Sequence, residues 1–75
     1  MKYDAEVDAI GLKCPMPILK CKRGLSTIES DQILKIMATD KDAKQDFEFF
    51  CNQTGHKLVS HKVENDINIF YIQKN

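Results

Sequence analysis

The chain of 75 residues lacks several of the features that point to particular classes of protein. It has no tryptophan, and its 11 basic and 11 acidic side chains cancel. The two kinds of charge are interspersed, so no extended field of one sign is available to hold a nucleic acid or a membrane surface. No apolar run is long enough to cross a bilayer, and the first residues lack the apolar core of a signal peptide. The composition therefore predicts a cytoplasmic protein that is not a general polyanion binder.

Cysteine and histidine are also scarce. The three cysteines form no CxxC pair, and His56 and His61 lie far from any paired cysteine, so no metal site is expected. An odd number of cysteines cannot close a set of disulfides, and in a reducing cytosol they would be thiols. A chain this short is expected to form one domain, residues 1–75, with a core too small to enclose a substrate cavity. Its function should therefore belong to its surface.

What the sequence does contain is a concentration of special residues in the stretch GLKCPMP, which begins at Gly11. The glycine frees the backbone to turn. Pro15 suits the first position of a helix, and a residue before proline favours the extended conformation, so Cys14 is expected to be the N-cap. Pro17 stiffens the turn and removes another amide donor, which leaves the Met16 amide among the donors that could face the sulfur.

This placement predicts a reactive thiol. A helix N-terminus and a neighbouring cation, here Lys13, both lower the pKa of a thiol below its ordinary value of about 8.5 and favour the nucleophilic thiolate. Cys21 follows seven residues later on the same predicted helix, beyond disulfide reach and within its apolar stripe, so a buried and inert thiol is expected there. The pattern therefore singles out Cys14 as the catalytic residue.

The stretch at residues 11–17 resembles the GLxCPxP signature of the small sulfur-carrier proteins of the TusA/SirA-like group. The later run at residues 46–58, DFEFFCNQTGHKL, is similar to the second helix of that family and its exit. The resemblance implies a sulfur relay in which Cys14 receives a persulfide sulfur from a cysteine desulfurase or a similar donor. The sulfur then passes to a downstream acceptor protein, for tRNA thiolation or other sulfur metabolism.

The same resemblance implies that the protein is a co-substrate rather than an enzyme. It would need no cofactor beyond the transient persulfide on Cys14. The residues expected to shape the site around that cysteine are Gly11, Lys13, Pro15 and Pro17. Met16 departs from the best-known tRNA-thiolation members, which carry an acidic residue there, and Lys41 stands where they carry a proline. These two differences concern the choice of partner.

The first helix is also expected to present a docking surface beside the cysteine. Four side chains form this mixed apolar and basic strip: Met16, Leu19, Lys20 and Arg23. Apolar contact and steering charges suit a partner, for which we favour an acidic protein over tRNA. A simple solvated face is the alternative for the two cations. Direct binding of nucleic acid is not expected.

Two other functions fit part of the sequence. A nucleic-acid-binding regulator would lose binding steeply with salt and would be indifferent to Cys14. A thiol redox sensor would need a resolving cysteine near Cys14, and neither Cys21 nor Cys51 is suitably placed. A protease-like pair of cysteine and histidine is not expected, because a domain this small offers no substrate cleft.

The two histidines are expected to have structural roles. His61 should pack across strands, and His56 should brace the end of a helix.

Hydrophobic periodicity predicts strands over residues 5–10, 32–39, 57–64 and 67–74, and helices over 15–29 and 41–54. Asp40 is the expected N-cap of the second helix, Gly55 its stop, and Asn65-Asp66 a hairpin turn. The strand-helix-strand passage implies a parallel pair. The fold class is therefore an α+β two-layer sandwich, βαβαββ, with two helices on one face of a four-stranded mixed sheet. The resemblance implies the same fold. We expect a monomer, with weak self-association conceivable through the uncovered sheet face.

Overall fold

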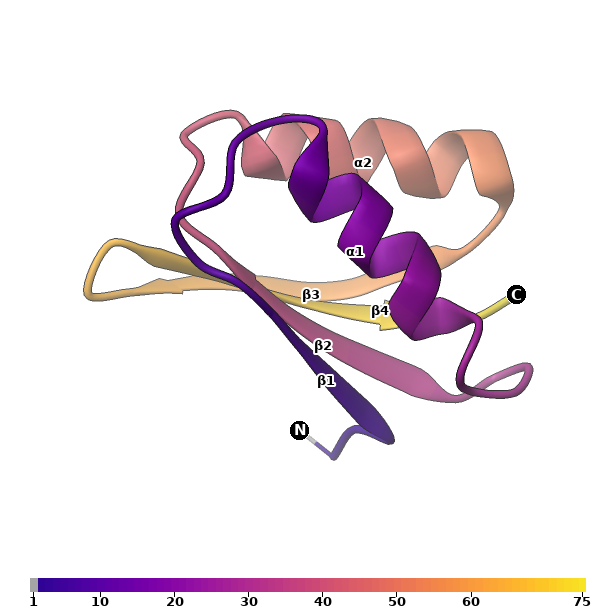
Figure 1. Ribbon diagram of the computed structural model, residues 1–75. Coiled ribbons are helices and arrows are strands. Elements are labelled where there is room, and N and C mark those ends of the chain that lie inside the picture. The colour runs from indigo at the N-terminus through magenta and orange to yellow at the C-terminus, as the bar shows by residue number, and fades with distance from the viewer. Residues whose placement is uncertain (1) are drawn as a thin grey trace.

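The computed structural model describes residues 2–75 and has two helices on one face of a four-stranded sheet (Figure 1). The elements are β1 (Ala5–Ala9), α1 (Met16–Leu25), β2 (Ile33–Ala38), α2 (Ala43–Thr54), β3 (Lys57–Glu64) and β4 (Ile67–Gln73). The strand order is β1-β2-β4-β3, with β1 parallel to β2 and the other two pairings antiparallel. This confirms the predicted α+β sandwich. Within residues 2–75, no helix is both long and apolar enough to cross a membrane.

The alternating pattern of the central strand β2 produces its two faces. Three of its side chains are buried beneath the helices and three are partly exposed on the other face: Leu34, Ile36 and Ala38 against Ile33, Lys35 and Met37. The Tyr3 ring lies over part of the sheet face that the helices leave uncovered. Its centroid is 6.3 Å from the centroid of the Tyr71 ring. The hairpin turn is confirmed as well, with φ of 51° at Asn65 and 65° at Asp66.

The core lies between the sheet and the two helices. Its largest fully buried side chains are Phe47, Phe70, Leu34, Ile36, Ile72 and Cys21. The rings of Phe47 and Phe70 lie 4.5 Å apart and join α2 to β4. Gly55 ends α2 with φ of 83°, as predicted. Packing of one face of each helix on the sheet holds the helix N-termini in fixed positions.

The first helix is shorter than predicted. It begins at Met16 and ends at Leu25 instead of extending over residues 15–29. Ser26 and Thr27 stop it, because their hydroxyls donate to the carbonyls of Arg23 and Gly24, both at 2.6 Å. These short-range bonds compete with the next helical turn. The chain then leaves α1 in tighter turns and reaches β2.

Gly24 lies inside α1 because the helix approaches the sheet closely there. A Cβ at this position would lie 2.6 Å from Val7 Cγ2 and 3.0 Å from Leu34 Cδ1. Alanine normally stabilises a helix by about 1 kcal/mol relative to glycine. Overpacking costs about 1–3 kcal/mol, and Val7 is too stiff at χ1 to move aside cheaply. The close approach therefore outweighs the helix propensity.

Gly24→Ala is accordingly expected to lower the free energy of unfolding by about 1 kcal/mol, as the net of these two effects. Urea denaturation followed by circular dichroism measures the change. Lys22→Ala is the matched control, since Lys22 lies on the same helix with an exposed side chain. It should stay within about 0.5 kcal/mol of the wild type. A higher denaturation midpoint for Gly24→Ala would mean that the helix does not press on Val7.

Candidate functional site

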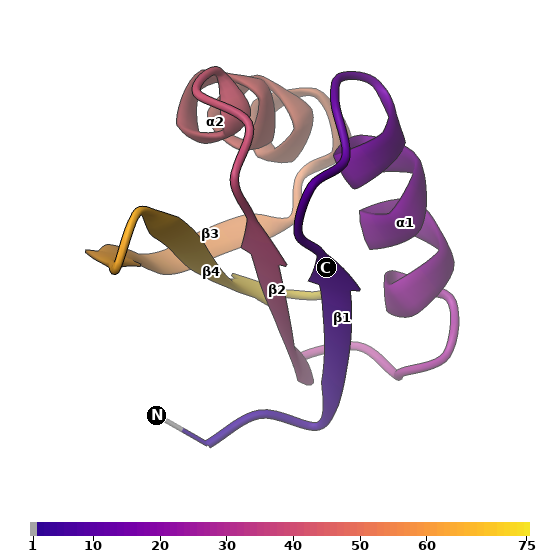
Figure 2. The ribbon, with the colours of Figure 1, turned by 60° about the vertical axis from the view of Figure 1, so that its left-hand side comes forward.

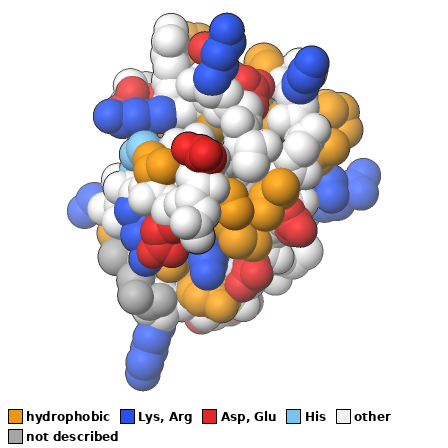
Figure 3. Space-filling model, turned by 90° about the vertical axis from the view of Figure 1, so that its left-hand side faces the viewer, with side chains coloured by type: hydrophobic (Ala, Val, Ile, Leu, Met, Phe, Trp, Pro, Cys, Tyr) orange, Lys and Arg blue, Asp and Glu red, His pale blue; other side chains and the backbone are white. Residues whose placement is uncertain are grey.

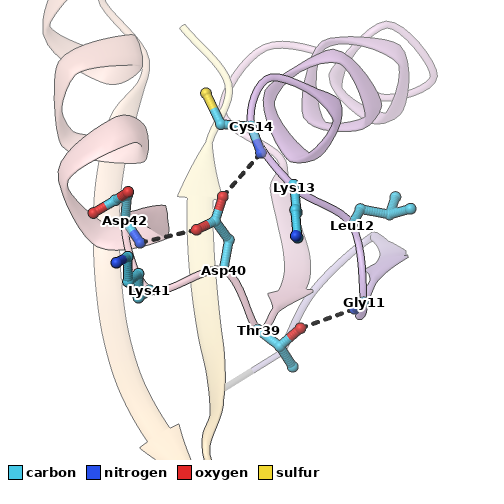
Figure 4. A pocket seen from close by; sticks show the side chains of 8 residues that line it. All are labelled: Gly11, Leu12, Lys13, Cys14, Thr39, Asp40, Lys41 and Asp42. Atoms are coloured by element: carbon cyan, nitrogen blue, oxygen red, sulfur yellow. Dashed lines mark hydrogen bonds between the residues drawn. The ribbon is translucent and has the colours of Figure 1, made fainter.

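Cys14 is exposed in the loop that joins β1 to α1. It borders an open hollow of about 540 Å³ (Figure 4). Two segments line this hollow, residues 11–14 of the β1–α1 loop and residues 39–42 of the β2–α2 loop. In Figure 4 the sulfur points away from the Asp40 carboxylate, into the space beside the two helices. The thiol is therefore accessible from solvent and is flanked by both loops.

Parallel pairing brings these loops together. Ala9 near the end of β1 pairs with Ala38 at the end of β2, so both strands end at the same edge of the sheet. Their loops leave that edge side by side (Figure 2). Gly11 has φ of 82°, a conformation that side-chain-bearing residues rarely adopt, which supports its predicted role in the turn. The fold thus places the Cys14 loop against a segment that is remote in sequence.

Two hydrogen bonds join the loops directly. The Cys14 amide donates to Asp40 Oδ2 at 2.9 Å, across 26 residues of sequence. The Gly11 amide donates to Thr39 Oγ1 at 2.9 Å. Sequence reasoning missed both contacts. The available signal was the polar pair Thr39-Asp40 at the end of the strand predicted over residues 32–39. Because that strand was predicted to pair in parallel with the first strand, its end should lie beside the Cys14 loop.

Asp40 is not the N-cap of α2, contrary to the prediction. The helix begins at Ala43 and its N-cap is Asp42, which makes no side-chain capping hydrogen bond. Asp40 Oδ1 instead accepts from the Asp42 amide at 3.1 Å, and the Asp40 carbonyl accepts from the Ala43 amide at 3.0 Å. The other carboxylate oxygen accepts a hydrogen bond from the Cys14 amide. The Asp40 side chain is therefore used to hold the two loops together, and Asp40 precedes the N-cap of α2.

The start of α1 also differs from the prediction. Pro15 occupies the N-cap, with Cys14 one residue earlier and a cis bond between them. The Met16 amide donates to the Lys13 carbonyl at 2.9 Å, so it is not free to face the sulfur. Pro15 and Pro17 have no amide hydrogen. The first turn therefore offers the sulfur fewer donors than a helix N-terminus normally would.

The electrostatic surroundings raise the pKa of the Cys14 thiol above its ordinary value, which overturns the predicted decrease. The largest cause is hydrogen bonding with the Asp46 side chain, followed by partial desolvation and by the negative charges of Asp46, Asp40 and Asp42. The pKa of the Asp40 carboxyl is lowered, chiefly by hydrogen bonds from the Asp42 and Cys14 amides, and the Lys13 charge adds to this decrease. Carboxylates from the second loop and helix thus dominate over the neighbouring cation, and the resting thiol is held in its protonated form.

Asp46→Asn is expected to make Cys14 more reactive near neutral pH. Removing the carboxylate lowers the pKa of the thiol and increases the thiolate fraction, while the intrinsic nucleophilicity falls by a smaller factor. The rate of alkylation by iodoacetamide should rise about threefold for each unit by which the pKa falls. Glu48→Gln, an exposed site on the same helix, should leave the rate unchanged. A slower or unchanged rate in Asp46→Asn would show that Asp46 does not govern the thiol.

The other two cysteines are buried. Cys21 is fully buried, and burial raises the pKa of its thiol to about 12. Burial raises the pKa of Cys51 to about 11. The prediction of a buried Cys21 is confirmed. Both thiols are therefore protonated at physiological pH and shielded from reagents.

The histidines have structural contacts. His56 Nδ1 accepts from the Asn75 amide at 3.0 Å, at the exit of α2. His61 stacks on Phe70 with ring centroids 4.7 Å apart and shares a hydrogen bond with Asn68. These contacts fit the predicted bracing and packing roles. In the part of the chain that the structure describes, no group of three or more histidine, cysteine or acidic side chains is placed to hold a metal ion.

The predicted docking strip is assembled on α1. Its four side chains line one small surface hollow of about 160 Å³: Met16, Leu19, Lys20 and Arg23. Met16 and Leu19 are 44% and 48% exposed. Figure 3 shows the end of the molecule that carries the loops, where side chains of both charges are interspersed with hydrophobic ones. The structure thus places an apolar strip with two cations on the helix that begins beside Cys14.

Comparisons with known proteins agree with this architecture. The family model described as "Sulfurtransferase TusA" matches residues 5–74. A putative sulfur carrier protein of Bacillus subtilis, YrkI, is 47% identical over 74 residues, which span 99% of each chain. The sulfur carrier protein TusA of Allochromatium vinosum is 43% identical over 72 residues, 96% of this chain and 95% of the relative.

A solved structure shares the fold. The crystal structure of a SirA-like protein from Desulfitobacterium hafniense superposes with a TM-score of 0.82, covering 93% of this chain and 96% of that one. Its sequence identity of 17% supports the fold alone. The family is established by the sequence matches, which extend over nearly the whole length and include the Cys14 loop. The chain therefore belongs to the TusA family of sulfur carrier proteins.

Proposed function

We propose that Cys14 carries sulfur as a persulfide, which it receives from a cysteine desulfurase or a similar donor and relays to an acceptor protein. The observation that supports this most directly is the contrast among the cysteines. Cys14 is exposed in the loop that bears the family signature, whereas Cys21 and Cys51 are buried. A carrier must present its sulfur to two other proteins in turn, and only an exposed thiol allows this.

The proposed chemistry is two successive displacements at sulfur. The Cys14 thiolate attacks the terminal sulfur of the donor persulfide, a new S–S bond forms, and the donor cysteine leaves as a thiolate. A thiolate of the acceptor then attacks the terminal sulfur on Cys14, and the Cys14 thiolate is regenerated. Each step is redox-neutral, so no external oxidant is required. The transient persulfide takes the place of a cofactor, and the protein acts as a co-substrate.

The raised pKa of Cys14 bears on where this chemistry occurs. The free protein holds a thiol, and the attacking species is the thiolate. A donor that brings positive charge to the rim formed by Asp40, Asp42 and Asp46 would offset the carboxylates and favour deprotonation. We therefore expect sulfur transfer to be faster within a complex than the reactivity of the isolated thiol suggests.

The strip on α1 is the proposed contact for these partners, with Gly11, Lys13, Pro15 and Pro17 shaping the loop that presents the sulfur. Met16 and Leu19 supply apolar contact, and Lys20 and Arg23 supply charge. The formal net charge of zero does not favour nucleic acid as the ligand. A cytoplasmic location and a monomeric state stay predictions.

The test is intact-protein mass spectrometry after incubation with a cysteine desulfurase and cysteine. The wild type is expected to gain one sulfur atom that a thiol reductant removes. A protein that gains no sulfur from several different desulfurases, while a relative known to accept sulfur is loaded in the same assay, would contradict the proposal. Salt-sensitive binding of nucleic acid by the same preparation would then support the binding-module alternative.

A further inference from the structure

Asp40 connects the two loops of the site at the residue that carries the thiol. One carboxylate oxygen accepts from the Cys14 amide at 2.9 Å and the other accepts from the Asp42 amide at 3.1 Å. Its own carbonyl accepts from Ala43, the first residue of α2. Since three hydrogen bonds fix the residue, both the position and the rotation of its carboxylate are determined.

The Cys14 amide has a particular importance in this arrangement. Its nitrogen is bonded to the Cα that carries the thiol, so a hydrogen bond to it restrains the peptide plane immediately before the reactive side chain. On the other side, the ring of Pro15 restricts the backbone conformation of the residue before it, which is Cys14. Held on both sides, Cys14 has little backbone freedom, and the direction of its Cα–Cβ bond is set.

We propose that Asp40 is the positioning residue of the sulfur-carrying loop. Its carboxylate holds the Cys14 amide and thereby directs the sulfur over the first turn of α2, where a donor or acceptor cysteine must approach. This inference rests on the function proposed above. Displacement at sulfur needs the attacking and leaving groups close to one line, so loss of the restraint should slow transfer.

The charge of Asp40 is suited to this role at physiological pH. Hydrogen bonds from the Asp42 and Cys14 amides, and the charges of Lys41 and Lys13, lower the pKa of its carboxyl. A carboxyl with a lowered pKa stabilises the folded state above the pKa of the unfolded chain, about 3.9, and loses that contribution as the pH falls through its folded value. The restraint is therefore complete at neutral pH and weakens only in acid.

The first measurement needs no sulfur donor. In the wild type, the Cys14 amide proton is expected to show an NMR shift that titrates in acid with the Asp40 carboxyl, at a pH below about 3.9. Asp40→Asn should abolish this titration, while Asp42→Asn should retain it. Absence of the titration in the wild type, or its retention in Asp40→Asn, would overturn the proposal. Because asparagine is nearly isosteric, this comparison does not depend on a disruptive variant.

The second measurement is the single-turnover rate of sulfur loading. Asp40→Ala should be slower by about 10- to 100-fold, since it leaves the amide without its acceptor. Asp40→Asn should restore part of the rate, because its single side-chain oxygen can accept from the Cys14 amide while its NH2 group replaces the oxygen that accepted from the Asp42 amide. Glu48→Ala, at an exposed site of α2 outside the hollow, is the control and should load like the wild type. A loss in Asp40→Asn as large as that in Asp40→Ala would assign Asp40 a general electrostatic role and overturn positioning.

The two measurements separate this inference from the proposed function. An acid titration of the Cys14 amide in a protein that never takes up sulfur would mean that the restraint exists and the relay does not. Sulfur loading without the titration would mean that the relay operates without Asp40. Thermal melts of every variant, monitored by circular dichroism, identify any loss that results from unfolding.

Discussion

Cys14→Ser is expected to take up no sulfur from any donor, whereas the wild type takes up one atom. Serine has nearly the same shape, but its hydroxyl is not ionised at physiological pH and does not attack a persulfide sulfur. The remaining thiols cannot substitute. Burial raises their pKa values to about 12 at Cys21 and about 11 at Cys51, and the folded chain shields both from a partner protein. The expected effect is therefore complete loss.

The matched controls are Cys21→Ala and Cys51→Ala, which should load like the wild type. Alanine is preferred to serine at these two sites because a buried hydroxyl without a hydrogen-bond partner costs about 1–3 kcal/mol. Intact mass after loading distinguishes the variants. Loss of loading in Cys21→Ala with the fold retained, or loading of Cys14→Ser, would show that the sulfur is carried elsewhere.

Phe47→Ala is expected to lower the free energy of unfolding by about 3–5 kcal/mol. Phe47 is fully buried at the centre of the core, and its ring lies 4.5 Å from Phe70 with a tilt of 37°. Such an aromatic pair adds about 0.5–1.5 kcal/mol beyond the buried area. Domains of this size are stabilised by only about 0.05–0.15 kcal/mol per residue, so the variant should be close to unfolding in water.

Phe49→Ala is the control for this loss, since it makes the same chemical change two residues along the same helix. Its ring is 65% exposed, and the free energy of unfolding should change by no more than about 0.5 kcal/mol. Urea denaturation followed by circular dichroism compares the two. Similar midpoints for Phe47→Ala and Phe49→Ala would show that α2 does not pack on the sheet through Phe47.

Most of the fold could be predicted because its determinants are local. The period of two in an extended strand puts Leu34 and Ile36 on one face of β2, which is the buried one. The positive φ values at Gly55, Asn65 and Asp66 occur where turn-forming residues predicted them. The single connecting helix between two strands implied the parallel pair. Helix boundaries were predicted less well. The Ser26 hydroxyl bonds back to the Arg23 carbonyl at the early end of α1, and the Asp40 side chain accepts from the Asp42 amide instead of capping α2.

The site was predicted only in part for a related reason. The motif around Cys14 is local and identified the exposed cysteine. The sign of the pKa shift depends on Asp46 and Asp40, which are remote in sequence and reach the thiol only through the parallel pairing. A helix N-terminus lowers the pKa of a thiol only where amide groups are free to face the sulfur. The Met16 amide is engaged by the Lys13 carbonyl, which cannot be deduced from residue types alone.

The most direct test of the central claim is to locate the transferred sulfur on the wild-type chain. After loading, iodoacetamide traps the persulfide, and trypsin separates the three cysteines into peptides of residues 14–20, 21–22 and 45–57. The account predicts an additional sulfur on the alkylated peptide 14–20 and on neither of the others. An additional sulfur on the peptide of Cys21 or Cys51, with none on that of Cys14, would contradict it.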